Sequence, residues 1–214
     1  MRYLIVCGGK TDKEFGLNEI KTDGIDAIIA ADSGMDFLYE NGVMPDIIVG
    51  DFDSATTKAL EFFERKGQTE IHRLNPIKDD TDTEYAIRLA IREGARSIVV
   101  LGATGSRIDH VLGNISLLGI GLESGIDISI IDTNNRIRMA DKPVTIEKSA
   151  QYGRFVSLIA VTDDNEVSLR GFKYPVTDYS FDRFTSLGIS NEIIDDYAVI
   201  DIHRGKFIII ESKD

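Results

Sequence analysis

Six short, mainly apolar segments in the first 132 residues constrain the fold of this chain more than any other feature. They are Tyr3–Cys7, Ala27–Ala30, Ile47–Val49, Glu70–Leu74, Ser97–Leu101 and Ile126–Ile131. Continuous rather than alternating hydrophobicity is typical of strands that are covered on both faces in a parallel sheet. Helical patterns fit between most of these segments. The sequence therefore predicts an α/β domain with a mostly parallel, doubly wound sheet.

Four helices are expected between these strands. Thr81 and Glu84 have the spacing of a capping box, and Gly94 is a plausible stop for the helix that they begin. A second helix is expected from Ser33 to Glu40, and a third after Ser54. The fourth begins near Ile108, and one apolar stripe of it would contain Ile108, Val111, Leu112, Ile115 and Leu118.

The character of the chain changes after Asn134-Asn135. The segments that follow are short, rich in β-forming residues and separated by turns, with a hairpin loop expected at 203–206. They are Val144–Glu147, Arg154–Val161, Glu166–Arg170, Tyr197–Ile202 and Phe207–Glu211. Because no helical pattern intervenes, residues 134–214 are expected to form a small all-β domain, a sandwich or a barrel, after an α/β domain at 1–133.

Composition excludes several classes of function. The 214 residues carry a net charge of −12, which argues against a nucleic-acid partner. There is no apolar run long enough to span a membrane, and the chain reaches Gly8-Gly9 too soon for a signal peptide. Cys7 is the only cysteine, so an intramolecular disulfide is impossible and a cytoplasmic location is expected. Within its apolar segment Cys7 is expected to be a buried small residue.

Two acidic residues, Asp51 and Asp53, follow the third apolar segment. Side chains alternate along an extended chain, so both carboxylates are expected to point to the same side. Two carboxylates held together repel, and each raises the proton affinity of the other. Mg²⁺ would stabilise such a pair, because it takes oxygen ligands and keeps room for waters and phosphates. The alternative interpretation is that Asp51 and Ser54 are turn and helix-cap residues.

Further polar residues are expected where other strands end. Asp32 and Ser33 follow the second strand, where either could simply cap a helix. Asp82 lies in the first turn of its helix, where an acid complements the helix dipole. Asp79 lies before the cap in an acidic cluster. Like charges crowded there cost stability unless a cation or Lys78 offsets them.

The Gly102–Arg107 loop follows the fifth strand. Its glycines would let the backbone approach a phosphate closely, and the next helix would offer free N–H groups. Arg107 could add a bidentate contact to phosphate oxygens. The loop is neither a Walker-type phosphate loop nor a dinucleotide-binding fingerprint. His110, just beyond it, could be a general base, but a packing or hydrogen-bonding role is favoured.

The strand ends of a parallel sheet meet at one edge, so these loops are expected to lie together. Acidic residues at two strand ends could hold Mg²⁺, and the glycine loop with its arginine could hold phosphates. Together they predict a site for metal-assisted phosphoryl-type transfer, in which positioning and charge stabilisation supply most of the catalysis.

The ordered set of these motifs resembles the thiamine pyrophosphokinase family over nearly the whole chain. The matching elements are Ala31-Asp32-Ser33-Gly34, Pro45-Asp46, Gly50-Asp51-Phe52-Asp53-Ser54, Lys78-Asp79-Asp80-Thr81-Asp82, Gly102–His110, Asn114 and Gly188-Ile189-Ser190-Asn191. The resemblance implies a homodimeric cytosolic enzyme with an α/β domain followed by a β-sandwich. It also implies transfer of pyrophosphate from ATP to the hydroxyl of thiamine, with Mg²⁺ as cofactor and with AMP and thiamine diphosphate as products.

The resemblance also implies roles for individual residues. Asp51, Asp53 and Asp79 would engage Mg²⁺ and the phosphates, with one of the three as the candidate acceptor of the hydroxyl proton, and Asp82 would support them. ATP and phosphate binding would involve Asp32, Ser33, Gly102, Thr104, Gly105, Arg107 and Asp109. Ser190 and Asn191 would contact thiamine from the partner subunit. The chain has no tryptophan, so stacking on thiamine would fall to a Phe or a Tyr. Asp80 occupies a variable position of the motif and is left out of the site.

The same resemblance implies a separate function for each domain. Residues 1–133 would bind ATP and Mg²⁺ and carry the catalytic groups, and residues 134–214 would bind thiamine and form the dimer. Two other functions are considered from the residues alone. An Asp-x-Asp pair with a metal also holds nucleotide sugars in glycosyltransferases, and a nucleotide or Mg²⁺ sensor would bind without turnover.

Overall fold

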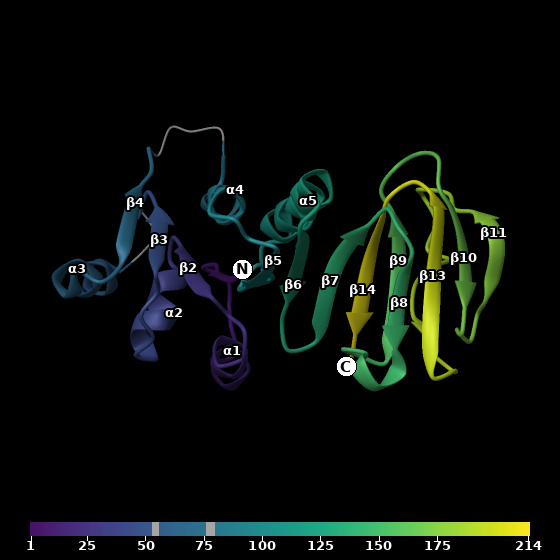
Figure 1. Cartoon of the computed structure of the whole chain (residues 1–214), viewed down its shortest axis with the longest axis horizontal. Helices are drawn as coiled ribbons and strands as arrows, with labels where there is room; N and C mark the ends of the chain where they lie inside the picture. Colours follow the sequence, from purple (N-terminus) through teal and green to yellow (C-terminus); the bar gives the residue numbers. More distant parts are fainter. Residues whose placement is uncertain (53–55, 76–79) are drawn as a thin grey trace. The chain divides into compact units, whose positions relative to one another are not determined.

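A computed structural model describes residues 1–52, 56–75 and 80–214 of the chain (Figure 1). The chain divides into two compact units, Met1–Thr133 and Asn134–Asp214. The first unit is an α/β layer and the second is built of antiparallel strands. The predicted fold class is thereby confirmed.

The first unit contains a parallel sheet of six strands flanked by helices (Figure 1). Its strands are β1 (Arg2–Val6), β2 (Ala27–Ala31), β3 (Ile47–Gly50), β4 (Glu70–Arg73), β5 (Ser97–Leu101) and β6 (Asp127–Ile131). Its helices are α1 (Lys13–Ile20), α2 (Gly34–Glu40), α3 (Thr57–Lys66), α4 (Asp82–Arg92) and α5 (Ile108–Ser124).

The strand order β6-β5-β1-β2-β3-β4 places β1 at the centre of this sheet. Leu4 of β1 pairs with Ile28 of β2 on one side and with Val99 of β5 on the other. The chain moves outward from β1 through β4, then returns to the opposite side of β1 for β5 and β6. The order therefore reverses between β1 and β5, and in open α/β sheets such a reversal is where ligands bind.

The start of α4 confirms the predicted capping box. The Thr81 side chain accepts a hydrogen bond from the backbone N–H of Glu84 at 3.2 Å. Gly94, with a φ of +87°, follows the end of the helix as expected. This cap fixes where Asp82 begins the helix, so the motif positions an acidic side chain as well as the backbone.

The N-cap of α3 differs from the prediction. Thr56 occupies that position, and Ser54, the cap that the sequence suggested, lies outside the described residues. The Thr56 hydroxyl donates to the carboxylate of Asp36 in α2, and its N–H donates to the same carboxylate at 3.3 Å. This tertiary contact, which links two helices, holds the start of α3 at Thr56.

The first turns of α5 are more exposed than the predicted apolar stripe implies. Ile108 is 66% exposed and Leu112 is 60% exposed, whereas Leu118 is buried. A helix of 17 residues is about 25 Å long. A strand of five residues spans only about 17 Å, so the sheet cannot cover the whole helix. Helix α1, which was not predicted, begins at an Asp12 cap that accepts from the N–H of Phe15.

The second unit consists of two antiparallel arrays of strands. Strands β12 (Asn191–Glu192), β9 (Phe155–Ala160), β14 (Phe207–Ser212) and β7 (Asn135–Ala140) lie side by side in that order. The second array is β11 (Val176–Ser180), β10 (Glu166–Arg170), β13 (Tyr197–Arg204) and β8 (Val144–Glu147). The short helix η1 (Lys148–Ala150) follows β8.

Residues from both arrays form one hydrophobic core, with Val156, Phe207 and Ile209 from the first array and Val167 and Ile200 from the second. The sandwich prediction for this region is therefore confirmed, although β7, β11 and β12 were not predicted. The loop between β13 and β14 is the two-residue turn Gly205-Lys206, within the predicted hairpin segment. Gly205 has a φ of +87°, as a tight hairpin turn requires.

A fully buried carboxylate also stabilises the second unit. Glu211 of β14 is 0% exposed and pairs with Arg136 at 2.7 Å and with Arg138 at 2.8 Å, both from β7. It also accepts a hydrogen bond from the N–H of Tyr152 at 2.9 Å. The charge of this buried acid is thus matched by two cations and a backbone donor.

Candidate active site

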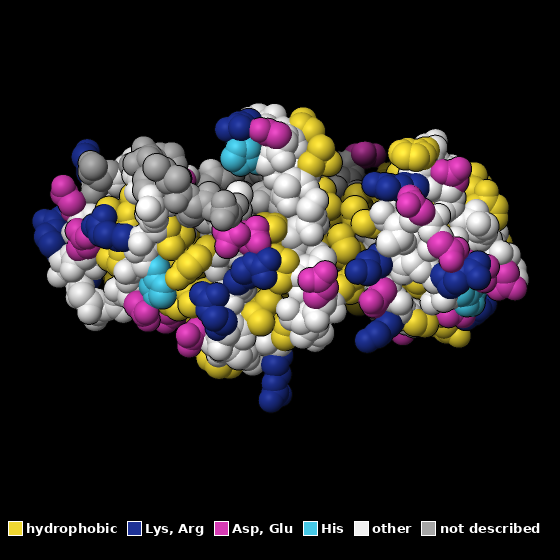
Figure 2. Space-filling view, turned by 90° about the horizontal axis from the view of Figure 1, so that it is seen from above, with side chains coloured by type: hydrophobic (Ala, Val, Ile, Leu, Met, Phe, Trp, Pro, Cys, Tyr) yellow, Lys and Arg dark blue, Asp and Glu magenta, His cyan; other side chains and the backbone are white. Residues whose placement is uncertain are grey.

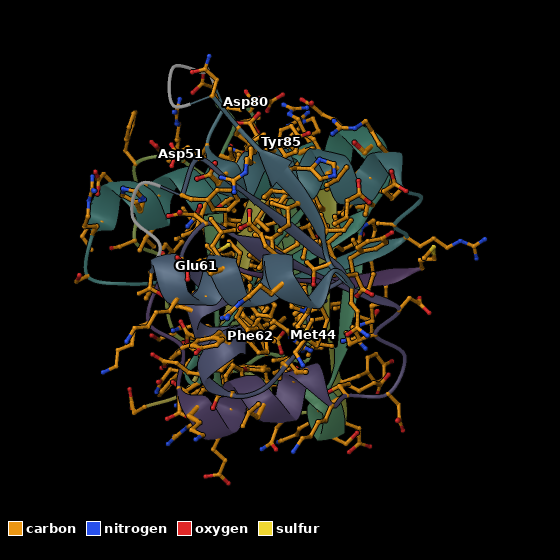
Figure 3. The ribbon with its side chains drawn as sticks, turned by 90° about the vertical axis from the view of Figure 1, so that its left-hand side faces the viewer. Met44, Asp51, Glu61, Phe62, Asp80 and Tyr85 are labelled. Atoms are coloured by element: carbon orange, nitrogen blue, oxygen red, sulfur yellow. The ribbon has the colours of Figure 1, made fainter. Side chains whose placement is uncertain are left out.

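The carboxyl ends of the parallel strands bring the predicted site residues of the first unit to one edge. Asp32 follows β2 and Asp51 follows β3, while Asp82 begins α4. Figure 3 shows Asp51 and Asp80 toward the same end of the sheet, and Met44, which precedes β3, toward the other end. The prediction that the polar strand ends share an edge agrees with this arrangement.

Three acidic side chains form a cluster at this edge. Oxygen atoms from Asp32, Asp51 and Asp82 all lie within 4.8 Å of one another, and all three residues are half-buried. Hydrogen bonding between neighbouring strands supports the cluster, because the N–H of Asp32 donates to the carbonyl of Val49 at 2.8 Å. This contact ties the end of β2 to β3 just before Asp51.

The backbone around the cluster adopts an uncommon conformation. Asp32 has a φ of +48° and Phe52 has a φ of +64°. Asp tolerates this left-handed region, but a bulky residue such as Phe rarely adopts it. Gly50 makes the arrangement possible, because a Cβ there would lie 3.1 Å from the Cα of Asp32 and 3.1 Å from the ring of Phe52. Strain of this kind is often found where a site is held in a fixed geometry.

The donor set fits a hard divalent cation. Three carboxylates so close together repel one another, and a cation between them would convert repulsion into attraction. Carboxylate oxygens are the ligands that Mg²⁺ takes, usually alongside waters and phosphates. Asp32, Asp51 and Asp82 could therefore hold the metal.

This cluster differs in membership from the expected metal set of Asp51, Asp53 and Asp79. Asp53 and Asp79 lie outside the described residues, so their predicted roles stay predictions. Asp32 was expected to contact ATP and Asp82 to support the metal ligands, yet the structure places both beside Asp51. The adjacency of β2 and β3 brings Asp32 into the cluster, and a sequence does not reveal strand order directly.

The glycine loop after β5 packs against the loop after β1. Gly9 donates its N–H to the carbonyl of Gly102 at 2.9 Å. Gly102 has a φ of +66°, and a Cβ there would lie 2.3 Å from the carbonyl oxygen of Cys7, so only glycine fits. Thr104 donates its hydroxyl to Asp132 at 2.8 Å. Gly105 is exposed. Ser33 lies against Gly8 on the other side of the β1 loop.

Arg107 precedes α5 and pairs with Asp109 in the structure. The two side chains approach to 2.6 Å, and both are exposed. The hydrogen bond from Arg107 is the main reason that the pKa of Asp109 lies below its ordinary value. Arg107 could exchange this carboxylate for a phosphate, since both accept a bidentate guanidinium. His110 is exposed on α5, so it does not pack in the core, and the hydrogen-bonding role that the sequence also favoured stays a prediction.

Cys7 lies buried beneath this edge, as predicted. The Thr83 hydroxyl donates to its Sγ at 3.5 Å. Burial, with a smaller contribution from the charge of Asp82, raises the pKa of the Cys7 thiol to about 11. The thiol is therefore protonated near neutral pH and is not suited to act as a nucleophile.

The predicted thiamine-contacting residues lie in the second unit. Ser190 has a φ of +60°, and its N–H donates to the hydroxyl of Ser157 at 3.0 Å. Asn191 accepts from the N–H of Tyr174 at 3.0 Å and donates to the Tyr174 carbonyl at 2.9 Å. Tyr174 itself is 61% exposed. The paired hydrogen bonds fix the backbone of Tyr174 beside Asn191, a neighbour that sequence reasoning did not identify.

The fold and the site together define a class of enzyme. Carboxylates gathered at the carboxyl edge of a parallel sheet, beside a glycine-containing loop and an arginine, are characteristic of transferases of the kinase type. The comparisons with known proteins identify the family within this class. Residues 21–130 match the family described as thiamin pyrophosphokinase, catalytic domain, and residues 143–207 match thiamin pyrophosphokinase, vitamin B1 binding domain. The chain belongs to the thiamine pyrophosphokinase family.

Individual relatives agree with this assignment. A thiamine pyrophosphokinase of Bacillus subtilis is 36% identical over 188 residues, which cover 87% of each chain. The crystal structure of thiamine pyrophosphokinase from Bacillus subtilis superposes with a TM-score of 0.89 and 31% identity, covering 100% of both chains. A thiamin pyrophosphokinase structure from Geobacillus thermodenitrificans superposes with a TM-score of 0.87 and 30% sequence identity. The match covers 100% of this chain and 98% of that chain.

These findings give no support to the glycosyltransferase or the non-catalytic sensor. The helices in the described part of the chain offer no segment with the length and apolar character needed to cross a membrane.

Proposed function

We propose that the chain is a Mg²⁺-dependent thiamine pyrophosphokinase that transfers the terminal pyrophosphate of ATP to the hydroxyl of thiamine. The observation that carries this proposal is the cluster of Asp32, Asp51 and Asp82 at the carboxyl edge of the sheet, in a member of this family. Such a cluster can concentrate metal and polyphosphate at one point of the edge. The products would be AMP and thiamine diphosphate.

Mg²⁺ bound at this cluster would neutralise the charge of the polyphosphate and stabilise charge that develops on its oxygens during transfer. The chain would hold it through Asp32, Asp51 and Asp82, whose oxygens lie within 4.8 Å of one another. Asp53 and Asp79, which the family resemblance adds to the metal set, remain candidates for further ligands or for the base that accepts the thiamine proton.

Arg107 and the Gly102–Arg107 loop would bind phosphate oxygens. Arg107 pairs with Asp109, and the exposure of both groups lets the guanidinium turn toward a phosphate. The exchange leaves the carboxylate of Asp109 in water, which solvates it well. Replacing Arg107 by Lys would keep the charge but lose the bidentate geometry, so the affinity for ATP should fall.

Thiamine would lie against the turn that contains Ser190 and Asn191. We assign the aromatic stacking surface to Tyr174, because Asn191 fixes its backbone through two hydrogen bonds and its ring is exposed. Lys173 lies over the Tyr174 ring at 5.6 Å and pairs with Glu192 at 2.9 Å. A cationic thiazolium could replace the Lys173 ammonium over this ring.

A homodimer with the active site shared between subunits is also proposed. The second unit exposes several large apolar side chains, and hydrophobic surface is visible on it in Figure 2. They include Tyr174, Phe184, Leu187, Ile189, Ile194 and Tyr197, with Phe184 91% exposed. Exposed apolar surface of this kind often marks an interface with another chain.

A complementation experiment tests the shared site. The variants Asp51→Asn and Asn191→Ala would each be inactive as pure dimers. If the site combines Asp51 of one subunit with Asn191 of the other, co-refolded mixtures should regain activity through heterodimers that contain one intact site. Mixtures that stay inactive, in the presence of demonstrated heterodimers, would show that both residues act within one chain.

A product assay tests the reaction itself. The purified chain is incubated with ATP, Mg²⁺ and thiamine, and nucleotides and thiamine esters are separated by chromatography. Equal amounts of AMP and thiamine diphosphate are expected, with none formed in excess chelator. Formation of ADP and thiamine monophosphate would contradict pyrophosphate transfer, and ATP binding without product would support the sensor instead.

A further inference from the structure

Phe52 follows Asp51 of the acidic cluster and has a backbone conformation that a bulky residue rarely adopts. Its φ is +64°, in the left-handed region. Such a conformation persists only where the surrounding structure holds it in place. The contacts of Phe52 therefore bear on the turn that carries Asp51, whose carboxylate must lie close to two others if they are to share a cation.

The ring of Phe52 lies back over the end of β3. A Cβ at Gly50 would lie 3.1 Å from this ring, so the ring covers the face of the strand at that residue. Arg73, the last residue of β4, is paired in register with Gly50. Residues paired on neighbouring strands direct their side chains to the same face of a sheet. The side chain of Arg73 therefore leaves β4 on the face that the ring covers.

Arg73 contacts this ring and is itself held by a helix. Its guanidinium carbon lies 5.4 Å from the centroid of the Phe52 ring, within the range of a cation–π interaction. The same guanidinium pairs with the carboxylate of Glu64 in α3. Because the Arg73 side chain is 60% exposed, these two contacts, rather than burial, fix its position. Arg73 thus links α3 to the ring of the residue beside Asp51.

We infer that Arg73 is a positioning residue for the metal site: it holds the ring of Phe52 and, through the strained Phe52 backbone, keeps the carboxylate of Asp51 in the cluster. The inference rests on the proposed function for the bound cation. The guanidinium is itself a cation, so its charge disfavours a second cation nearby. Its positioning effect favours that cation. The two effects on metal affinity have opposite signs, and an experiment can separate them.

Binding of Mn²⁺ alone tests the positioning role without relying on turnover. Mn²⁺ takes the same oxygen ligands as Mg²⁺, and the electron paramagnetic resonance signal of the free ion measures its dissociation constant. The signal is assigned to the cluster by its loss in Asp51→Asn. Arg73→Met keeps an apolar stem and removes the cation. It should raise the dissociation constant about 2- to 5-fold, as expected for one exposed cation–π contact, whereas the charge effect alone would lower it.

Two further variants connect this effect to the Phe52 ring. Arg73→Lys, which keeps a cation for the ring, should bind Mn²⁺ with an affinity between those of Arg73→Met and the unmodified chain. In a Phe52→Leu background the ring is absent, so adding Arg73→Met should weaken Mn²⁺ binding no further.

The matched control is Arg65→Met. Arg65 is an exposed arginine of α3 that donates to the carbonyl of Glu61 in its own helix at 3.2 Å. Its replacement removes the same charge and should not weaken Mn²⁺ binding.

Unchanged or tighter Mn²⁺ binding in Arg73→Met would overturn the inference, even if the unfolding temperature fell, because Arg73 would then have a structural role only. An equal loss of affinity with and without the Phe52 ring would also overturn it. If the unmodified chain binds no Mn²⁺, the proposed metal site fails, and this inference fails with it. If Mn²⁺ binding follows the expected pattern but no thiamine diphosphate forms in the product assay, the proposed function fails while the positioning role stands.

Discussion

Replacing Asp51 by Asn should change the stability of the chain in opposite directions with and without Mg²⁺. Oxygen atoms of Asp32, Asp51 and Asp82 lie within 4.8 Å of one another. Two unit charges at 4.8 Å repel by about 0.9 kcal/mol in water and by about 3.5 kcal/mol at an effective dielectric constant of 20. The substitution removes two of these repulsions, so the metal-free variant should be more stable by about 2 kcal/mol.

In the presence of Mg²⁺, the Asp51→Asn substitution should lower the stability of the chain relative to the unmodified protein. The cation binds the folded cluster and not the unfolded chain, so it raises the stability of the unmodified protein as its concentration rises above the dissociation constant. The variant loses a charged ligand and should gain much less. Thermal unfolding in chelator and in saturating Mg²⁺ measures both effects, and 2 kcal/mol corresponds to a shift of about 4–8 °C for a chain of this size.

Asp127→Asn is the matched control. Asp127 begins β6 at the opposite end of the strands and is exposed. Replacing it by Asn therefore removes the same charge without altering the cluster. The unfolding temperature of Asp127→Asn should rise with Mg²⁺ by as much as that of the unmodified chain. An equal Mg²⁺-dependent shift in Asp51→Asn and in the unmodified chain would refute the assignment of Asp51 to a metal site.

Three further predictions concern stability and protonation. Thr81→Ala removes the cap of α4 and should lower the free energy of unfolding by about 1 kcal/mol in denaturant titrations, whereas Thr81→Ser should restore most of it. Glu211→Gln leaves Arg136 and Arg138 without their counter-charge and should lower the free energy of unfolding of the second unit by about 3–5 kcal/mol. A decrease of less than about 1 kcal/mol would contradict these contacts. The thiol of Cys7 has a pKa of about 11 against an ordinary value near 9, so between those pH values the unfolded chain loses this proton while the folded chain keeps it. Stability should therefore fall by up to about 3 kcal/mol more in the unmodified chain than in Cys7→Ala over that range, and equal pH profiles would argue against burial of the thiol.

The sequence predicted the α/β layer well because its strands are continuously apolar and its best helix has strong end signals. The Thr81 cap and the Gly94 stop depend on local hydrogen bonds and backbone angles, which residue types reveal. Thr56 could not be identified as the cap of α3 from the sequence, because its position at the start of the helix depends on a contact with Asp36, twenty residues away. Such tertiary contacts carry no local pattern.

The site was predicted only in part, because contacts between distant segments leave no local pattern in the sequence. The motifs revealed that acids and glycines end several strands, but not which of them meet. Asp32 joins Asp51 because β2 and β3 are neighbours, and Asp82 joins both because α4 begins at this edge. Tyr174 escaped notice because it lies seventeen residues before Asn191, and only the fold of the second unit brings them into contact.

The fate of an isotopic label in ATP tests the central claim most directly. ATP labelled on the β-phosphate is incubated with the chain, Mg²⁺ and thiamine, and the label is followed in each product. Pyrophosphate transfer predicts that all of the transferred label appears in thiamine diphosphate and none in the released AMP. Label retained in a nucleoside diphosphate, with unlabelled thiamine monophosphate as the other product, would contradict the account.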